Sequence, residues 1–568
     1  MQGIIVKAQT HNTIDSVNQA EQLERDRAAD ENQRQIERYR KDQQPPDGDD
    51  FLPPERNITQ FEDACLHINT ILVTGVTLLP NTIVDNSVAE FEGQCIGVSA
   101  LNNILEIITY LYIEQGYIAS RALLTEQDLS DGILEIIVIE GRLDSIVMDD
   151  DSATHKNQIN TAFPGLIGKP VNLRDVEQGL YQLNRLRSND ATIEIEAGQN
   201  QGSSVLKISR NKSKTWQVGI GFDNLGSTST GKYQSKLDLE LDDLFELNDQ
   251  LRFSYQRSTT RNPYYFHDNP RSDTYTGHIS VPYGYWTFSV NGSLSEYNSK
   301  IRGNFSDIET SGHSQSINTS ISRVLHRDQT SITSLTGKLT RKNTENFILG
   351  SLIDVSSRAL SISTVELIHS RQFWDGQLIT SAAYHQGLNI LDAYDDNDAP
   401  AGSPKGQFRS MTGSLSYFKY FIQNENIWTY NGQLNGQYAP DQLFGSEQVA
   451  YGGYSTIRGL RESVVFGNRG ILMRNEIAFQ LPQSRNQHYA KTFGTPELYT
   501  VLDHGNVFEQ NRIGIEGGDL TGFGVGFRNR GGRIGFDVAW MEIVDSSTHL
   551  KESLSGSGLI YGRLSYFF

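Results

Sequence analysis

Residues 216–223 read WQVGIGFD, and this stretch decides how most of the chain is interpreted. Its apolar positions alternate with polar residues or glycine: Trp216, Val218, Ile220 and Phe222. A period of two indicates a β-strand with one apolar face. The same alternation returns at 251–256 and 286–291. About 16 such segments of roughly ten residues follow one another to the C-terminus, which is an even number and a length typical of membrane-barrel strands.

A soluble β-sandwich would also alternate, so the connections between the segments must separate the two fold classes. The connections at 392–406 and 439–468 are long and polar, whereas the one at 529–532 is tight. Long loops at one end and short turns at the other are typical of outer-membrane barrels. We therefore expect residues 211–568 to form an all-β transmembrane barrel of about 16 antiparallel strands.

Composition excludes several other classes of protein. Only 37% of the 568 residues are hydrophobic, and no stretch approaches the ~20 apolar residues that a spanning helix needs. A helical membrane protein is therefore excluded. The net charge of -19, from 68 acidic and 49 basic residues, argues against a nucleic-acid partner.

The N-terminal region is polar and predicted to be helical. Residues 13–41 avoid glycine and proline and place opposite charges four positions apart, as in Glu21 with Arg25. Their few apolar residues form no continuous stripe, so we expect this helix to lie in solvent or in a water-filled lumen. A proline- and aspartate-rich linker is predicted at 42–60. Because no signal peptide is visible at 1–10, we expect the chain to be a mature exported form.

Two copies of a small α+β unit are predicted between the linker and the barrel. In residues 61–141, an apolar run at 68–76 precedes helical patterns at 82–91 and 99–115, and strands are expected at 117–124 and 132–139. The order β-α-α-β-β returns in residues 142–210. The first unit holds Cys65 and Cys95. A disulfide is favoured over two buried free thiols, and it would place this unit in an oxidising compartment such as the periplasm.

The C-terminus carries a further signal. Leu564, Tyr566 and Phe568 fall on one face of the last predicted strand. This spacing of terminal apolar and aromatic residues resembles the assembly signal of bacterial outer-membrane barrels. The alternative is an ordinary last strand of a β-protein.

In this order, the predicted elements resemble the transporters of two-partner secretion, the haemolysin-activation and secretion family, over essentially the whole chain. The resemblance makes the two small units POTRA domains. In the first, the matching residues are Gly93, Gln94, Cys95, Ile96, Gly97, Gly116, Tyr117, Gln127, Asp128, Leu129 and Gly132. In the second, they are Phe163, Pro164, Gly165, the run NLRDVEQG at 172–179, Leu183, Asn184 and Arg185.

Two motifs within the predicted barrel resemble those of the same family. Ile457, Arg458, Gly459 and Leu460 resemble its Val-Arg-Gly-aromatic motif, although Leu460 is not aromatic. Asp503 and Gly505 resemble its Asp-x-Gly motif on a wall strand. The resemblance implies that a long loop folds back into the lumen and that Arg458 forms an ion pair with Asp503. A guanidinium and a carboxylate can form such a pair through two parallel hydrogen bonds.

The resemblance implies an outer-membrane transporter that recognises the N-terminal secretion domain of a large exoprotein and exports it unfolded without nucleotide hydrolysis. The cargo would be a haemolysin, an adhesin or a contact-dependent toxin, and the N-terminal helix would plug the lumen. Outer-membrane lipids and the barrel-assembly machinery are expected as further partners of a monomeric transporter. A barrel-assembly factor is the alternative.

The sequence offers little support for an enzyme. We find no G-x-S-x-G elbow before a helix, no H-E-x-x-H spacing and no Walker A run, and residues 522–526 are strand-like rather than a phosphate loop. No catalytic residues, metal ligands or cofactors are therefore expected.

Overall fold

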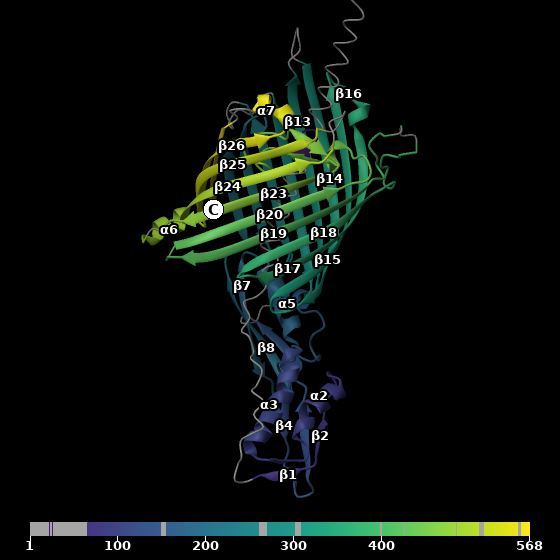
Figure 1. Cartoon of the computed structure of the whole chain (residues 1–568), viewed down its shortest axis with the longest axis vertical. Helices are drawn as coiled ribbons and strands as arrows, with labels where there is room; N and C mark the ends of the chain where they lie inside the picture. Colours follow the sequence, from purple (N-terminus) through teal and green to yellow (C-terminus); the bar gives the residue numbers. More distant parts are fainter. Residues whose placement is uncertain are drawn as a thin grey trace, which may run out of the picture.

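A computed structural model describes residues 22, 25–26, 65–148, 155–260, 270–301, 308–397, 400, 402–424, 426–483, 485–509, 516–554 and 558–568. A closed barrel forms one end of the molecule and two small domains project from it in line (Figure 1). We call the barrel opening next to these domains the near end and the opposite opening the far end. Apart from Gln22, Arg25 and Asp26, which are helical, the predicted plug helix and linker lie outside the described residues.

The first small domain packs two helices on a three-stranded sheet. Its elements are β1 (Leu66–Ile68), β2 (Thr70–Thr74), α2 (Asn81–Val88), the 3-10 turn η1 (Ala89–Phe91), β3 (Gln94–Ile96), α3 (Val98–Glu114), β4 (Arg121–Leu124) and β5 (Ile133–Ile139). The sheet order is β2-β5-β4, and β1 pairs separately with β3. Ile104, Ile108 and Tyr112, spaced four residues apart on α3, are fully buried in the core. Their spacing places them on one face of the helix.

Two strand predictions in this domain need correction. The apolar run at 68–76 divides into β1 and β2 because both Asn69 and Thr70 donate their amides to the Gly132 carbonyl, which redirects the chain. The strand predicted at 117–124 begins only at Arg121. The amide of Ser120 donates to the Tyr117 carbonyl at 3.1 Å, so residues 117–120 form a turn.

The second small domain has the predicted β-α-α-β-β order. Its elements are β6 (Arg142–Met148), α4 (His155–Ala162), α5 (Leu173–Asn184), β7 (Asn189–Ala197) and β8 (Ser203–Lys212), and the sheet order is β6-β8-β7. Asn172 caps α5 by accepting a hydrogen bond from the Arg174 amide at 2.9 Å. The cap explains why this helix starts inside the NLRDVEQG run.

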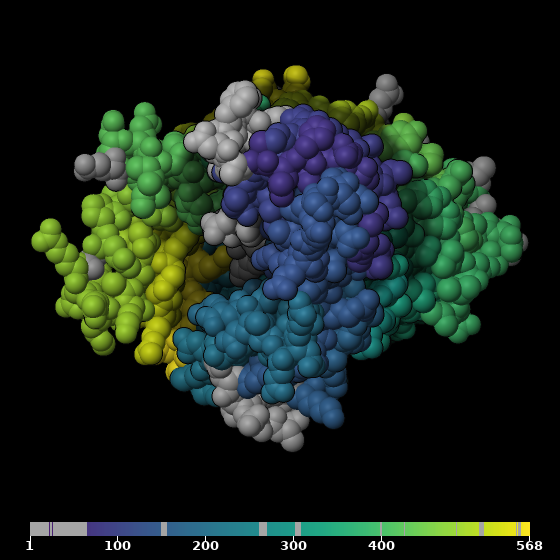
Figure 2. Space-filling view, turned by 90° about the horizontal axis from the view of Figure 1, so that it is seen from below, coloured from purple at the N-terminus to yellow at the C-terminus, as the bar shows by residue number. Residues whose placement is uncertain are grey.

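The second domain is fixed to the near end of the barrel through buried polar groups. Gln178 and Gln182 of α5 both donate to the Gly284 carbonyl, at 3.0 and 2.7 Å. Arg327 donates to Gln178 at 3.1 Å, and Arg185 donates to the Asn248 carbonyl at 2.7 Å. Seen from the near end, the two domains lie across the barrel opening (Figure 2). The domain therefore stands beside the route into the lumen.

Sixteen antiparallel strands close the barrel, as predicted, and β9 pairs with β27. They are β9 (Trp216–Asp223), β10 (Tyr233–Asp242), β11 (Gln250–Thr259), β12 (Arg271–Tyr283), β13 (Trp286–Ile301), β14 (Ile308–Arg327), β15 (Ser331–Ile348), β17 (Arg358–Phe373), β18 (Gly376–Leu388), β19 (Arg409–Gln423), β20 (Asn426–Tyr438), β23 (Gly470–Gln480), β24 (Thr495–Val507), β25 (Gly518–Arg530), β26 (Ile534–Ser546) and β27 (Leu559–Phe567). The two-residue strand β16 (Ser351–Leu352) extends β15 at the far end.

The alternation seen in the sequence becomes the two faces of this wall. Trp216, Phe253 and Trp286 are 38–44% exposed on the outer face. Large apolar side chains on the outside of a closed sheet suit contact with lipid tails. Among the described residues, no helix has the length and apolarity needed to cross a membrane.

Candidate functional site: the lumen loop and the wall that holds it

The loop between β20 and β23, residues 439–469, is the lumen loop. It contains the 3-10 turn η3 (Gly445–Glu447) and a hairpin of β21 (Val449–Tyr451) and β22 (Val465–Gly467). Its segment 457–460 lies against the inner face of the barrel, where Ile457 is 0% exposed. The predicted motif thus lies where the resemblance implied, inside the barrel.

Arg458 and Asp503 form the centre of the site. Nε and Nη2 of Arg458 donate to Oδ2 and Oδ1 of Asp503, both at 2.6 Å. The Arg458 backbone amide also donates to Oδ2, at 3.1 Å. The two residues are 4% and 0% exposed. Removing one member of such a buried pair typically costs about 3–5 kcal/mol, because the remaining charge is stranded.

The ion pair continues into a network that lies outside the two sequence motifs and was not predicted. Nη1 of Arg458 donates to Glu476 of β23 at 3.0 Å. Glu476 also accepts from Arg528 of β25 at 2.6 Å, and Arg528 reaches Glu497 of β24 at 3.1 Å. Charged residues at alternate positions of a predicted membrane strand were the available signal, since such residues must face the lumen.

Two further wall residues hold the loop by its backbone. Arg474 of β23 donates to the carbonyls of Ser455 and Tyr454, at 2.9 and 3.2 Å. The Tyr561 hydroxyl of β27 donates to the Leu460 carbonyl at 2.6 Å. These bonds place the two sides of the Arg458 turn independently of the ion pair.

A compact apolar cluster surrounds the motif. It joins loop residues to wall residues and to Leu550 of α7 (Thr548–Leu554), at the far end of the barrel (Figure 1). Its buried members are Tyr451, Ile457, Leu460, Val465, Leu472, Val507, Leu520, Ile543 and Leu550. Leu460, which replaces the family's aromatic residue, is 7% exposed in this cluster. Its role here is aliphatic packing.

The described residues of the N-terminal helix contact the same loop. Gln22 donates to the Ser463 carbonyl at 3.0 Å, and Asp26 accepts from the Ser463 amide at 3.2 Å. The Arg25 guanidinium lies 3.7 Å from the centre of the Phe466 ring and is 3% exposed. At these three positions the helix therefore touches the lumen loop.

The inner face of the opposite wall differs in chemistry. We call the inward faces of β12, β13 and β14 the polar wall; from 274 to 280, 287 to 295 and 314 to 322 they carry hydroxyl, amide and imidazole groups. These groups pair across strands, as Ser289 with Ser320 at 2.6 Å and Thr274 with Ser295 at 3.1 Å. We call the inward faces of β23 to β27 the latch wall. The two walls thus carry different kinds of polar group: uncharged groups on the polar wall and charged groups on the latch wall.

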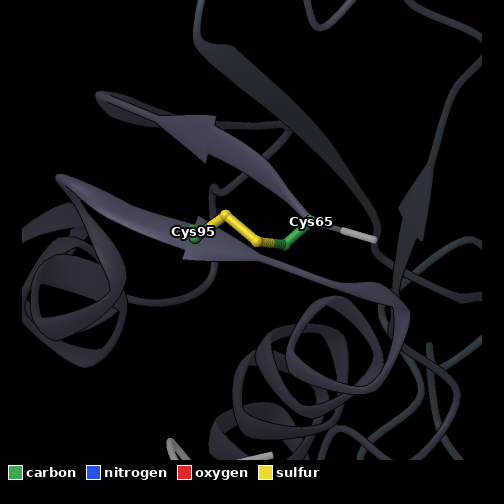
Figure 3. Close-up of a disulfide and its surroundings, with 2 residues drawn as sticks. All are labelled: Cys65 and Cys95. Carbon is green, nitrogen blue, oxygen red and sulfur yellow. A yellow bond between two sulfur atoms is a disulfide. The ribbon is translucent and has the colours of Figure 1, made fainter. Parts of the chain in front are cut away.

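Two other predicted sites lie away from the loop. Cys65 and Cys95 form the predicted disulfide, with Cα atoms 5.4 Å apart, and it links the start of β1 to β3 (Figure 3). Leu564 and Tyr566 of β27 lie opposite Phe222 and Ile220 of β9 on the outer face. Within the described part of the chain, no group of three or more His, Cys, Asp or Glu could hold a metal ion.

Comparison with known proteins identifies related chains across this whole architecture. The family model for haemolysin secretion/activation protein ShlB/FhaC/HecB matches residues 202–529. A POTRA domain model of the ShlB type matches 66–141, and a second POTRA domain model matches 142–197.

Individual relatives agree with these models. Outer membrane transporter CdiB of Dickeya dadantii is 34% identical over 469 residues, covering 82% of this chain and 80% of that protein. CdiB of Escherichia coli is 31% identical over 489 residues, with 85% and 80% covered. The solved structure of CdiB from Escherichia coli superimposes with a TM-score of 0.85 at 29% identity, over 97% of this chain and 98% of that one.

Proposed function

The chain belongs to the haemolysin secretion/activation family of ShlB, FhaC and HecB, and from that premise we propose that it exports its cargo past a lumen loop latched to the barrel wall by Arg458 and Asp503. It is an outer-membrane transporter of two-partner secretion, with its POTRA domains in the periplasm. The near end of the barrel therefore faces the periplasm and the far end faces the cell exterior.

The observation that carries the proposal is the latch itself. Three hydrogen bonds join the Arg458 residue to Asp503, and the network continues to Glu476 on the neighbouring strand. The same loop also reaches β15, where Lys342 donates to Glu447 at 2.6 Å, so the latch fixes the Arg458 segment of the loop and not the whole loop. The polar wall offers an unfolded chain hydroxyl and amide groups, which form exchangeable hydrogen bonds without the strong attraction of a fixed charge. We propose that cargo passes along the polar wall.

The cargo is a large exoprotein with an N-terminal secretion domain, of the haemolysin, adhesin or contact-dependent toxin kind. Capture takes place on the POTRA domains, where β2 and β4 are the edges of one sheet and β6 and β7 are the edges of the other. An extended segment can add to such an edge through main-chain hydrogen bonds. Beyond the end of β4, the side chain of Gln127 takes the place of a strand beside β5: it donates to the Glu135 carbonyl at 2.7 Å and accepts from the Glu135 amide at 2.6 Å.

The N-terminal helix is a removable plug in this proposal. The contacts of Gln22, Arg25 and Asp26 with the lumen loop support a position inside the barrel. The plug leaves the lumen when cargo enters. We also propose the following division of the chain: the plug helix at 1–41, the linker at 42–60, the first POTRA domain at 61–141, the second POTRA domain at 142–210 and the barrel at 211–568.

No chemical step is needed for this function, and the chain is proposed to be neither an enzyme nor a cofactor protein. Folding of the cargo outside the cell would supply the driving force. Leu564, Tyr566 and Phe568 are proposed to guide assembly of the barrel, so the barrel-assembly machinery is a transient partner. Outer-membrane lipids then surround a monomer.

Co-expression with a large exoprotein that carries an N-terminal secretion domain tests the proposal. We expect full-length exoprotein in the medium only when both genes are present. The matched control is an exoprotein lacking its N-terminal secretion domain, which should stay in the periplasm. Equal release of the intact exoprotein without this chain would contradict the proposal.

A further inference from the structure

Alternate glycines line the inner face of β25 within the latch wall. Residues 522–526 read GFGVG, with glycine at every second position. In the structure, a Cβ atom built on Gly524 would lie 2.4 Å from Cγ of Met541, and one built on Gly526 would lie 2.4 Å from Cζ of Tyr499. Each of these glycines thus leaves space that a neighbouring side chain fills.

Gly522 is different because the atom that fills its space belongs to the backbone of the lumen loop. A Cβ at Gly522 would lie 2.1 Å from the carbonyl oxygen of Arg458. Gly522 is also the cross-strand partner of Asp503, so the loop crosses β25 directly beside the ion pair. Gly505 on β24 makes similar room, since its Cβ would lie 2.7 Å from Cδ1 of Ile457.

We propose that Gly522 is a positioning residue for the lumen loop: by lacking a side chain, it lets the Arg458 peptide lie against the wall at the depth where its guanidinium meets Asp503. Gly505 belongs to the family motif found in the sequence, whereas Gly522 lies outside it. The role of Gly522 in placing the loop follows from the geometry alone, whereas its importance for export rests on the proposed function.

The geometry also predicts how a methyl group acts. A carbonyl oxygen cannot rotate away as a side chain can, so the loop must move by roughly 1.3 Å to restore an ordinary contact of about 3.4 Å. The two bonds between Arg458 and Asp503 are now 2.6 Å long. Lifting the loop by that amount lengthens them beyond about 2.9 Å, the upper end of the range for a strong charge-assisted bond.

Gly221 of β9 provides a matched control. It also faces the lumen, between Gly219 and Asp223, but a Cβ there would meet its first neighbour, Cβ of Lys236, at 3.5 Å. This is an ordinary van der Waals distance. Gly221→Ala therefore adds the same methyl group to the same kind of surface without displacing the loop.

The experiment measures loop position and export separately. Leu460→Cys supplies a thiol that is buried when the loop is in place, and the two native cysteines are already joined in a disulfide. In this background, Gly522→Ala should make the introduced thiol react with a membrane-impermeant maleimide and should lower secretion roughly tenfold or more, the usual scale of overpacking. Gly221→Ala should do neither. Heat-modifiable gel mobility confirms that each barrel is folded.

Each outcome decides a different claim. If the thiol at position 460 stays protected in Gly522→Ala, the inference is wrong, whatever happens to secretion. If that thiol becomes reactive while secretion stays normal, Gly522 positions the loop and the proposed need for a latched loop is wrong. If Gly522→Ala prevents folding, adding Arg458→Ala together with Asp503→Ala should restore a folded barrel, because the loop is then free to move away from the methyl group and neither partner of the ion pair is left stranded. Failure of that rescue would overturn the inference.

Discussion

The latch wall and the polar wall belong to one barrel and obey one outer pattern, yet their inner faces are built differently. On the latch wall, Arg458, Glu476 and Arg528 form a buried ionic chain beside an apolar cluster. On the polar wall, uncharged groups such as Ser289 and Ser320 pair with one another. Among the described residues, the latch wall holds the Arg458 segment of the lumen loop, whereas the polar wall meets the second POTRA domain at Ser280, which accepts from Arg185 at 2.6 Å. The chemistry of the inner face therefore follows what each part of the barrel binds: charged groups hold the buried Arg458 segment, and uncharged groups line the opposite wall.

The largest difference between the walls should appear when an ion pair is cut on each. Arg458→Ala strands Asp503 in a buried site and frees the loop, so secretion should fall by a factor of roughly a hundred, as expected for about 3 kcal/mol. Lys338→Ala cuts the ion pair between β15 and β17 that joins Lys338 to Glu366 at 2.6 Å, next to the polar wall. Glu366 is only 7% exposed and is stranded as well, but the cut pair joins two wall strands and not the loop, so secretion should change less than about twofold. An equal loss of secretion in Arg458→Ala and Lys338→Ala would contradict the special role of the latch wall.

Removing the plug tests what occupies the lumen beside the latch wall. Deleting residues 13–41 should raise single-channel conductance in planar bilayers several-fold, because a helix has a diameter of about 10 Å. A milder version is Arg25→Ala, which removes the contact with Phe466 and should increase the frequency of openings. Unchanged conductance after the full deletion would rule out the plug.

Tyr561→Phe tests a second anchor of the lumen loop on the latch wall. It removes one hydroxyl, which donates to the Leu460 carbonyl at 2.6 Å and accepts from the Gly459 amide at 3.3 Å, and leaves the ring that packs edge-on against Tyr454. The loss of these two bonds is worth about 1–2 kcal/mol, so maleimide labelling of a thiol introduced at position 460 should rise by roughly five- to thirtyfold. Labelling as strong as in Arg458→Ala would mean that the hydroxyl anchors the loop as firmly as the ion pair does.

The smallest effect on the barrel should come from the disulfide in the first POTRA domain. In the chain-entropy model, a bridge closing about 30 residues stabilises its domain by around 3–4 kcal/mol. Cys65→Ser with Cys95→Ser should therefore lower the melting temperature of that domain while leaving the heat-modifiable mobility of the barrel unchanged. Altered barrel mobility would mean that the domain and the barrel do not unfold separately.

The first POTRA domain also predicts a pH effect. Burial opposes ionisation of Glu140, but hydrogen bonds from Thr77, Leu78 and Tyr112 outweigh it and lower the pKa of Glu140 below its usual value. A lowered pKa stabilises the folded domain above the unfolded-state pKa, and this stability is lost as the pH falls through the folded-state pKa. Glu140→Gln should reduce the difference in domain stability between neutral and acidic pH. An unchanged difference would contradict this role.

The outer face of the barrel was predictable because lipid imposes one simple rule on it, the alternation that starts at Trp216. The position of Arg458 opposite Asp503 was predictable only through the resemblance to a family. Glu476 and Arg528 were missed because strand pairing, which the sequence does not specify, brings them together across β23, β24 and β25. The turn at 117–120 was missed because its backbone hydrogen bonds leave no pattern of apolar residues.

Gly522 shows most clearly what a single sequence withholds. Its neighbours in the chain mark it as one glycine of a strand, and only the position of the Arg458 carbonyl gives its missing side chain a purpose. The loop contributes a backbone carbonyl to this contact, and every residue type has one, so the sequence of the loop does not indicate the contact. The role of Gly522 can therefore be inferred only from the three-dimensional structure.

The most direct test of the latch is a double-mutant cycle on secreted cargo. Arg458→Ala and Asp503→Ala are compared singly and together, with heat-modifiable mobility confirming a folded barrel in each case. Because the two residues act through one interaction, the account predicts that the double variant secretes about as little as either single variant, with a coupling energy of roughly 2–3 kcal/mol. Fully additive losses, or normal secretion from Arg458→Ala, would contradict it.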